Sequence, residues 1–160
     1  MTNAVPRSPA GGPTRVLVLH GPNLNLLGTR EPEIYGDLSL EEIDRRIADR
    51  ARSLGLEVRC AQSNLEGALV EEIQRAGTWA QAIVLNPGGY SHTSVAIRDA
   101  VAAVSIPVIE VHLSNPFARE AFRHADVVGG AARGVVSGFG WRSYLVALQA
   151  VAEILEGGAS

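Results

Sequence analysis

Short apolar runs alternate with amphipathic helical segments along this chain, and the alternation restricts its fold more than any other feature. The predicted strands are short and mostly apolar, and cover residues 15–20, 56–61, 82–85, 107–111 and a weaker segment near Val135 and Val136. Apolar side chains at helical spacing predict helices over residues 40–54, 63–77, 94–104 and 142–155, and a short helical segment at 118–123. Strands and helices in strict alternation predict a parallel sheet with helices on both faces.

Five strands in a chain of 160 residues fit an α/β, flavodoxin-like three-layer sandwich with strand order 2-1-3-4-5. Charged residues alternate with Val58 and Cys60 in the second strand, which predicts a position near the sheet edge. In such sheets a ligand binds beyond the carboxyl ends of the strands, between strands one and three. We expect one catalytic domain over residues 15–156, after a disordered tail over residues 1–14 that is rich in Pro, Gly and Ala.

The connection over residues 20–36 is much longer than the two to six residues that usually join a strand to a helix. It precedes a capping box, Ser39-x-x-Glu42, which predicts the start of the next helix. Long loops of this kind are often functional, and this one carries glycines, Asn, Arg and Tyr. It is therefore predicted to be an active-site lid.

Composition excludes several classes of function. All 14 basic residues are arginine, so Schiff-base chemistry, pyridoxal phosphate enzymes and lysine-dependent phosphate loops are excluded. A net charge of −3 gives no electrostatic support for binding nucleic acid or an anionic membrane. The single cysteine, Cys60, excludes an intrachain disulfide and favours a reducing compartment. With no apolar membrane span or signal-peptide region, we expect a cytoplasmic protein.

Tyr35 and Arg30 are the most informative pair in the long connection. A lone loop tyrosine usually packs as part of a lid, but a neighbouring guanidinium favours the phenolate, which can act as a base. Arg30 alone is typical of a surface charge or a ligand clamp. Asn23 and Asn25 either bind a ligand or satisfy backbone groups of the loop.

Polar residues also follow the third and fourth predicted strands, at the same edge of the sheet. Asn86 precedes Pro-Gly-Gly, which lets a ligand approach the backbone, and is the favoured contact among the asparagines. His112 is either a structural histidine or an acid–base group, with Glu110 two residues earlier on the same strand face to orient it. Ser114 lacks the Gly-x-Ser-x-Gly turn expected of an acyl-transfer nucleophile.

The other histidines carry weaker signals. His92 begins a helix and is either a cap or a ligand contact, and His20 either lines the site or is packed. His124 is predicted to lie at the surface. The histidines are widely spaced and no cysteine cluster accompanies them, so no metal site is expected.

An ordered series of motifs resembles the type II 3-dehydroquinate dehydratase family. The lid signature comprises Gly21-Pro22-Asn23-Leu24-Asn25-Leu26-Leu27-Gly28, Arg30-Glu31-Pro32 and Tyr35-Gly36. The later motifs are residues 62–64, 86–89, 91–96 with Asp99, 110–115, and Arg119, Glu120, Phe122 and Arg123. Together these motifs cover about residues 15–156, in order and at the expected spacing.

The resemblance implies a flavodoxin-like hydro-lyase that needs no cofactor. Members of the family remove water from 3-dehydroquinate by anti elimination through an enolate and form 3-dehydroshikimate. The reaction belongs to the shikimate pathway of aromatic amino-acid biosynthesis, or to quinate use. The lack of lysine agrees, because the type I enzymes of this reaction need a Schiff-base lysine. The family's assembly is a dodecamer of trimers.

The resemblance also implies a role for each matched residue. Tyr35 takes the proton α to the ketone, Arg30 holds it as phenolate, and Asn23 holds a water that stabilises the enolate. His112 protonates the departing hydroxyl, with Glu110 behind it. The implied substrate contacts are Asn86, His92, the backbone of Leu113, Ser114, Arg123, and Asp99 from a neighbouring subunit.

Three features depart from the family pattern. His20 stands where Asn is common, residues 124–130 differ from the usual segment, and residues 142–143 precede Tyr144 in an unusual form. We expect the last two departures to lie away from the chemistry and to affect packing or assembly.

Two other interpretations remain. A non-catalytic module of the same fold would bind a small anionic metabolite through Arg30, Arg123 and amides at the strand ends. A nucleotide-binding flavodoxin-like protein is disfavoured, because the phosphate-binding loop is missing.

Overall fold

The computed structural model describes residues 11–29 and 31–157. Within them, one parallel sheet has the order β2-β1-β3-β4-β5, which confirms the predicted flavodoxin-like order with β2 at an edge. The strands are β1 (Thr14–His20), β2 (Leu56–Gln62), β3 (Ala82–Asn86), β4 (Val108–His112) and β5 (Gly134–Ser137). Most of the predicted tail, and Arg30, lie outside the described residues, and Thr14 already belongs to β1. The limits proposed for the catalytic domain remain a prediction.

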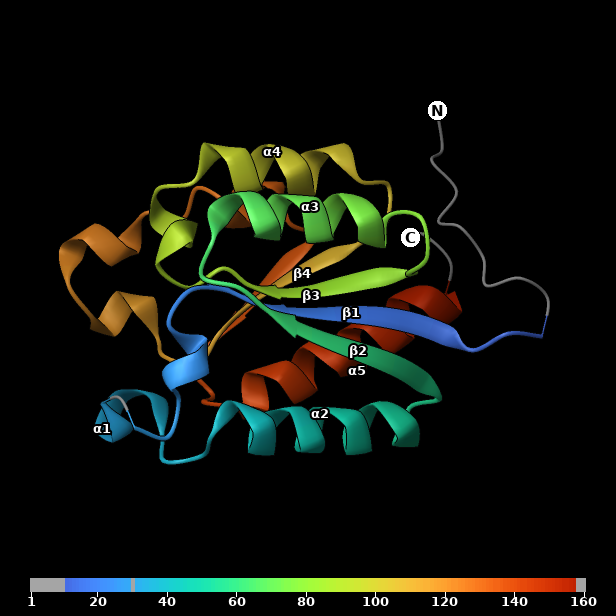
Figure 1. Cartoon of the computed structure of the whole chain (residues 1–160), viewed down its shortest axis with the longest axis horizontal. Helices are drawn as coiled ribbons and strands as arrows, with labels where there is room; N and C mark the ends of the chain where they lie inside the picture. The colour runs from blue at the N-terminus through green and yellow to red at the C-terminus, as the bar shows by residue number, and fades with distance from the viewer. Residues whose placement is uncertain (1–10, 30, 158–160) are drawn as a thin grey trace.

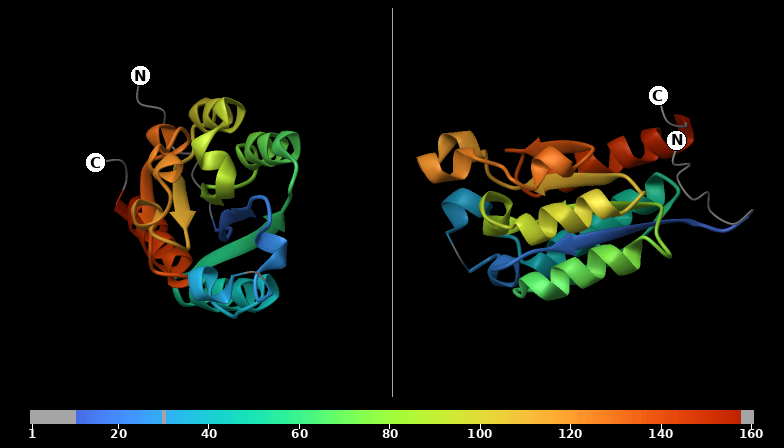
Figure 2. Two further views of the ribbon diagram at one scale, coloured as in Figure 1. Left: turned by 90° about the vertical axis from the view of Figure 1, so that its left-hand side faces the viewer. Right: turned by 90° about the horizontal axis from the view of Figure 1, so that it is seen from above.

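Helices cover both faces of the sheet (Figure 1). The α-helices are α1 (Pro32–Tyr35), α2 (Leu40–Ser53), α3 (Glu66–Ala76), α4 (Val95–Ala103) and α5 (Arg142–Gly157). Short 3-10 helices are η1 (Leu24–Leu26), η2 (Gly88–His92), η3 (Pro116–Ala118), η4 (Ala121–His124) and η5 (Gly129–Ala131). Helices α2 and α5 lie on one face and α3 and α4 on the other, as the end-on view in Figure 2 shows.

Alternate side chains of the central strand β1 build two separate cores. Val16 and Val18 pack in the cluster that includes residues of α2 and α5, whereas Leu17 and Leu19 pack in the cluster that includes residues of α3 and α4. All four side chains are fully buried. Each such side chain contributes about 1.5–3 kcal/mol when it leaves water, so the sheet is held firmly from both sides. A rigid sheet in turn gives its carboxyl edge a defined shape.

Local hydrogen bonds set where the helices begin. The predicted cap of α2 is present, because Ser39 Oγ accepts the Glu42 N–H at 3.2 Å. Helix α3 begins at Glu66, three residues after the predicted start, because Ser63 Oγ instead accepts the Leu65 N–H at 3.0 Å and forms a turn. The helix predicted over residues 118–123 is two 3-10 helices, η3 and η4, with Arg119 and Glu120 between them.

The described part of the long connection after β1 is anchored to the core. Leu24 and Leu27 are buried in the core beside α2 and α5, and the connection contains η1 and α1. Gly21 starts it in close contact with the residues after β3: its N–H donates to the Asn86 carbonyl at 2.7 Å, and a Cβ here would lie 2.7 Å from the Pro87 carbonyl carbon. Glycine is therefore required where the two loops meet.

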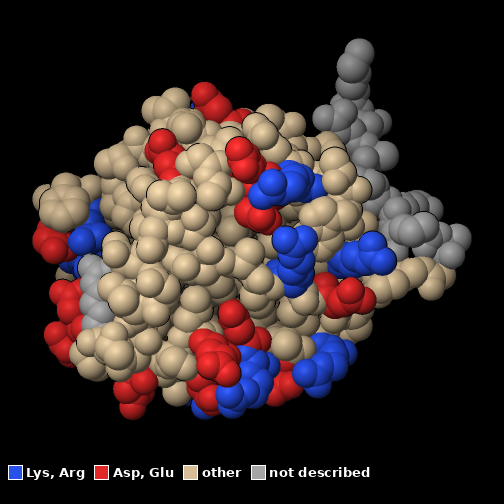
Figure 3. Space-filling view, in the orientation of Figure 1, with Lys and Arg blue, Asp and Glu red and all other residues tan. Residues whose placement is uncertain are grey.

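Helix α1 and the segment from η3 to η5 lie at the carboxyl edge of the sheet, as Figure 2 shows from that side. On the face in Figure 3, acidic and basic side chains are interspersed along α2. This helix carries the ion pairs Arg45–Glu42 and Arg52–Asp49.

Among the described residues, no helix has both the length and the apolar character needed to cross a membrane.

Candidate active site

A pocket of about 130 Å³ lies at the carboxyl edge of the sheet. Its lining includes eight residues predicted for the site: Asn23, Tyr35, Asn86, His92, His112, Leu113, Ser114 and Arg123. Tyr35, Leu113, Ser114 and Arg119 also line a neighbouring cavity of about 490 Å³. The structure thus brings together side chains from the long connection and from the ends of β3 and β4, as the edge rule for parallel sheets predicts.

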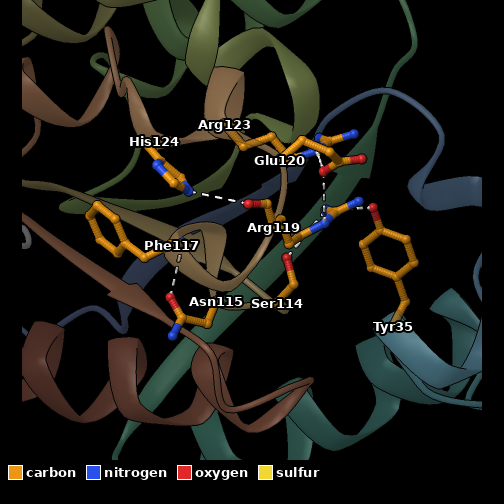
Figure 4. A network of polar contacts seen from close by, with 8 residues as sticks. All are labelled: Tyr35, Ser114, Asn115, Phe117, Arg119, Glu120, Arg123 and His124. Carbon is orange, nitrogen blue, oxygen red and sulfur yellow. Dashed lines mark hydrogen bonds and ion pairs between the residues drawn. The ribbon is translucent and has the colours of Figure 1, made fainter.

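Tyr35 is contacted by Arg119, to which sequence reasoning assigned no role. The Arg119 Nη1 donates to Tyr35 Oη at 2.9 Å and to Ser114 Oγ at 3.3 Å. Figure 4 shows the guanidinium directed at the phenol oxygen. The contact places a positive charge beside the phenol oxygen. Arg119 follows β4 at the carboxyl edge, so the same edge rule could have singled it out.

His112 and Glu110 form a buried pair on β4. Their side chains share a face because they are two residues apart, and His112 Nε2 lies 2.5 Å from Glu110 Oε1. Nδ1 is therefore the ring nitrogen left for a substrate. Burial raises the pKa of Glu110 to about 7 despite the opposing effect of His112, and Asp126 contributes to the increase.

Asp126 lies beside this pair, which corrects the expectation that residues 124–130 are remote from the chemistry. Single ligand atoms of Glu110, His112 and Asp126 all lie within 4.8 Å of one another. The segment is held by the backbone, since the N–H groups of Val127 and Val128 both approach the Ser91 carbonyl. Ser91 and the segment at Val127 are far apart in the sequence, so no spacing pattern predicts that they meet.

Asn86 is fixed at both ends of its side chain. Its Oδ1 accepts the Gly88 N–H at 3.1 Å, and its Nδ2 donates to the Tyr144 hydroxyl at 3.0 Å. That hydroxyl lies 2.8 Å from His20 Nδ1, and His20 Nε2 lies 2.7 Å from Asp44 Oδ1. Burial raises the pKa of Tyr144, so the hydroxyl keeps its proton and donates a hydrogen bond to His20 Nδ1. His20 then donates from Nε2 to Asp44.

This network decides between the two interpretations of His20. The ring is fully buried and bonded on both nitrogens, so His20 is packed beneath the site and does not line it. Its effect on the pocket passes through Tyr144 to Asn86.

Replacing Tyr144 by Phe tests this support. The variant leaves the Asn86 amide and the His20 ring without their shared hydroxyl, and we expect the free energy of unfolding to fall by about 2 kcal/mol. Urea denaturation measures this change. The matched control is Tyr90→Phe, which removes a hydroxyl bonded to the Asn64 carbonyl in an exposed contact, and should change stability little. Equal effects of the two variants would contradict the role given to the buried network.

The remaining predicted contacts differ in placement. His92 donates from Nδ1 to the Ala125 carbonyl at 2.7 Å, which leaves Nε2 available, and Arg123 Nε donates to Glu120 at 2.8 Å. Asp99 is exposed on α4, 3.7 Å from Arg98, and does not line this pocket.

Two groups of side chains within the described residues have the composition of a metal site: His20, Asp44 and Cys60, and Glu110, His112 and Asp126. In the first, the His20 and Asp44 atoms are hydrogen-bonded to each other, and burial raises the pKa of the Cys60 thiol, which disfavours the thiolate that metals bind. In the second, His112 and Glu110 are bonded to each other. Hydrogen bonds within each group explain why these side chains lie close together. The absence of a metal remains a prediction.

Comparison with known proteins now identifies the family. Residues 14–152 match the family model described as dehydroquinase class II. This chain belongs to that family. The 3-dehydroquinate dehydratase of Desulforudis audaxviator is 53% identical over 144 residues, which are 90% of this chain and 96% of the relative. That of Phenylobacterium zucineum is 58% identical over 137 residues, which are 86% of this chain and 94% of the relative.

Solved structures agree with the assignment. The type II dehydroquinase from Butyrivibrio crossotus has 45% identity and a TM-score of 0.86, over 88% of this chain and 99% of that one. The type II dehydroquinase of Propionibacterium acnes has 40% identity and a TM-score of 0.85, over 87% and 96%. The family resemblance in the motifs is thus confirmed, and the chain belongs to a family of enzymes. Tyr35 and His112 line one pocket.

Proposed function

We propose that this protein removes water from 3-dehydroquinate to form 3-dehydroshikimate. The observation that carries the proposal is a tyrosine bonded to a guanidinium and a histidine bonded to a carboxylate, both lining one pocket. An elimination needs a base for one atom and an acid for the leaving group, and these two pairs supply both. Relatives that bear the name 3-dehydroquinate dehydratase, aligned over most of their length, support the substrate.

Tyr35 is the proposed base. As phenolate it takes the proton from the carbon α to the ketone, and the Arg119 N–H at 2.9 Å stabilises the negative oxygen before the transfer. The family resemblance implies that Arg30, which lies outside the described residues, supplies a second cation. The electron pair of the broken C–H bond moves into an enolate, and Asn23 in the pocket lining holds a water that stabilises the enolate oxygen.

His112 is the proposed acid. It gives the proton on Nδ1 to the departing hydroxyl, which leaves as water from the face opposite Tyr35, so the elimination is anti. Glu110 bonds Nε2 and thereby keeps the ring oriented with Nδ1 toward the substrate. The enolate then collapses to the conjugated ketone, and no cofactor takes part.

Substrate hydroxyls and the carboxylate are held by the remaining lining residues. Arg123 supplies a charged donor for the carboxylate, and His92 Nε2, Ser114 Oγ and the Leu113 backbone supply contacts to hydroxyls. Asn86 takes part through a side chain that Tyr144 and Gly88 already orient. Such fixed donors bind without reorganising, which favours the transition state.

We also propose that the protein assembles as a dodecamer of trimers, works in the cytoplasm and serves the shikimate pathway. Exposed aromatic side chains near the site support an assembly: Phe117 is 72% exposed and Phe122 64%. Asp99, exposed on α4 and absent from its own chain's pocket lining, is then free to reach the site of a neighbouring subunit.

Turnover of 3-dehydroquinate by the purified protein tests the function. The conjugated product absorbs in the ultraviolet, so its appearance is followed directly and its identity checked by chromatography. Product formation without added cofactor is the expected result. If the substrate binds, by calorimetry, but no product forms, the protein is instead a binding module with the same fold.

A further inference from the structure

Glu110 has a second carboxylate as a neighbour, and the proposed mechanism does not use it. Asp126 comes from the segment before η5 and is exposed, whereas Glu110 lies fully buried in β4. Ligand atoms of both carboxylates and of His112 lie within 4.8 Å of one another. Asp126 Oδ1 accepts the Gly129 N–H at 2.7 Å, which holds the carboxylate in this position.

The two oxygens of Glu110 have different surroundings. Oε1 is bonded to His112 Nε2, whereas Oε2 is buried and has no hydrogen-bond donor among the residues that the structure describes. A buried ionised oxygen without a donor is costly, and a carboxylate facing another carboxylate more so. One proton placed between Glu110 and Asp126 removes both costs, because the protonated group becomes a donor to the other.

We propose that Asp126 is a positioning residue that shares one proton with Glu110 and so reduces the negative charge that faces His112. This inference rests on the proposed function, in which His112 must release a proton to the leaving group. A full charge on Glu110 would bind that proton tightly, whereas a shared charge lies partly on Asp126, farther from the ring. Asp126 is exposed, so the shared proton exchanges with solvent.

The charged groups around Glu110 fit this arrangement. His112 and Asp126 are the titratable groups that act on it, and the pKa of Glu110 is raised to about 7 by burial and by Asp126 against the effect of His112. His92, on the neighbouring η2, is bonded to the Ala125 carbonyl, and Arg123 is paired with Glu120.

Asp126→Asn is the decisive variant, because the amide keeps an oxygen for the Gly129 N–H and offers an N–H to Glu110 Oε2. Two measurements on this variant are expected to change. In the ligand-free protein, the Glu110 carboxyl, observed by carbon-13 NMR and assigned through Glu110→Gln, should titrate about one pH unit lower. In the assay, the alkaline limb of kcat/KM should move up by about one pH unit, because His112 keeps its proton longer.

Asp49→Asn is the matched control, since it removes an exposed aspartate that pairs with Arg52 on α2. This control should change neither the Glu110 titration nor the alkaline limb of kcat/KM. An unchanged Glu110 titration in Asp126→Asn overturns the shared proton. A lowered titration with an unmoved alkaline limb overturns the effect on His112. If the wild type has no turnover but the titration moves, the proposed function fails while the shared proton stands.

Discussion

Replacing Tyr35 by Phe is expected to lower kcat for 3-dehydroquinate about a thousandfold. The change removes one oxygen, and with it the base and the hydrogen bond from Arg119. The ring itself packs against the core that includes α2 and α5, and Phe keeps that packing. KM should therefore change little, because the loss falls on the proton transfer rather than on binding. Steady-state ultraviolet assays measure kcat and KM, and thermal unfolding checks that the packing is retained.

Tyr90→Phe serves as the control here too, because Tyr90 bonds the Asn64 carbonyl and does not line the pocket. A Tyr35→Phe variant that keeps more than about a tenth of the wild-type kcat would contradict the role of base. Arg119→Lys refines the test. A lysine keeps the positive charge but not the planar Nη1 group that donates to both Tyr35 and Ser114, so an intermediate loss is expected.

Replacing His112 by Ala is expected to lower kcat by a similar factor, about a hundredfold to ten-thousandfold, because the leaving hydroxyl loses its acid. The wild type should show a bell-shaped profile of kcat/KM against pH, since the base must be deprotonated and the acid protonated. In the variant the alkaline limb should disappear, because that limb reports the acid. A retained alkaline limb would assign the proton transfer to a different group.

The same variant should also alter how stability depends on pH. The pKa of Glu110 is raised in the folded protein from 4.5 to about 7, so its contribution to stability is complete below pH 4.5 and is lost as the pH rises through 7. Removing His112 removes a group that lowers this pKa, so the loss should extend to higher pH. Urea denaturation between pH 4.5 and 9 measures it, and Glu110→Gln should remove this dependence.

Eight residues predicted from the sequence line one pocket, and several of them do so because they follow strand ends. Asn86, His112 and Ser114 come directly after or at the ends of β3 and β4, and parallel strands present those ends at one edge. Short apolar runs and helical periods are local signals, and they predicted both the elements and their order. The error at residue 63 is also local, since a serine that could cap a helix instead forms a turn.

Contacts between distant segments required the tertiary structure. Tyr35 and Arg119 are 84 residues apart, and His20 and Tyr144 are 124 apart, so no spacing in the sequence connects them. Asp126 was predicted to be remote because it lies in a segment unlike the family motif, yet the hydrogen bonds to Ser91 bring that segment against Glu110.

The sequence by itself determined the α/β order of the elements and which polar residues meet at the carboxyl edge of the sheet. These follow from periodicity and from the right-handed connection between parallel strands, which leave few arrangements open. The tertiary structure decided that Arg119 contacts Tyr35, which hydrogen bonds orient Asn86 and which carboxylate adjoins Glu110. Such partners depend on how loops from different strands pack over one edge, and that packing is a property of the whole fold.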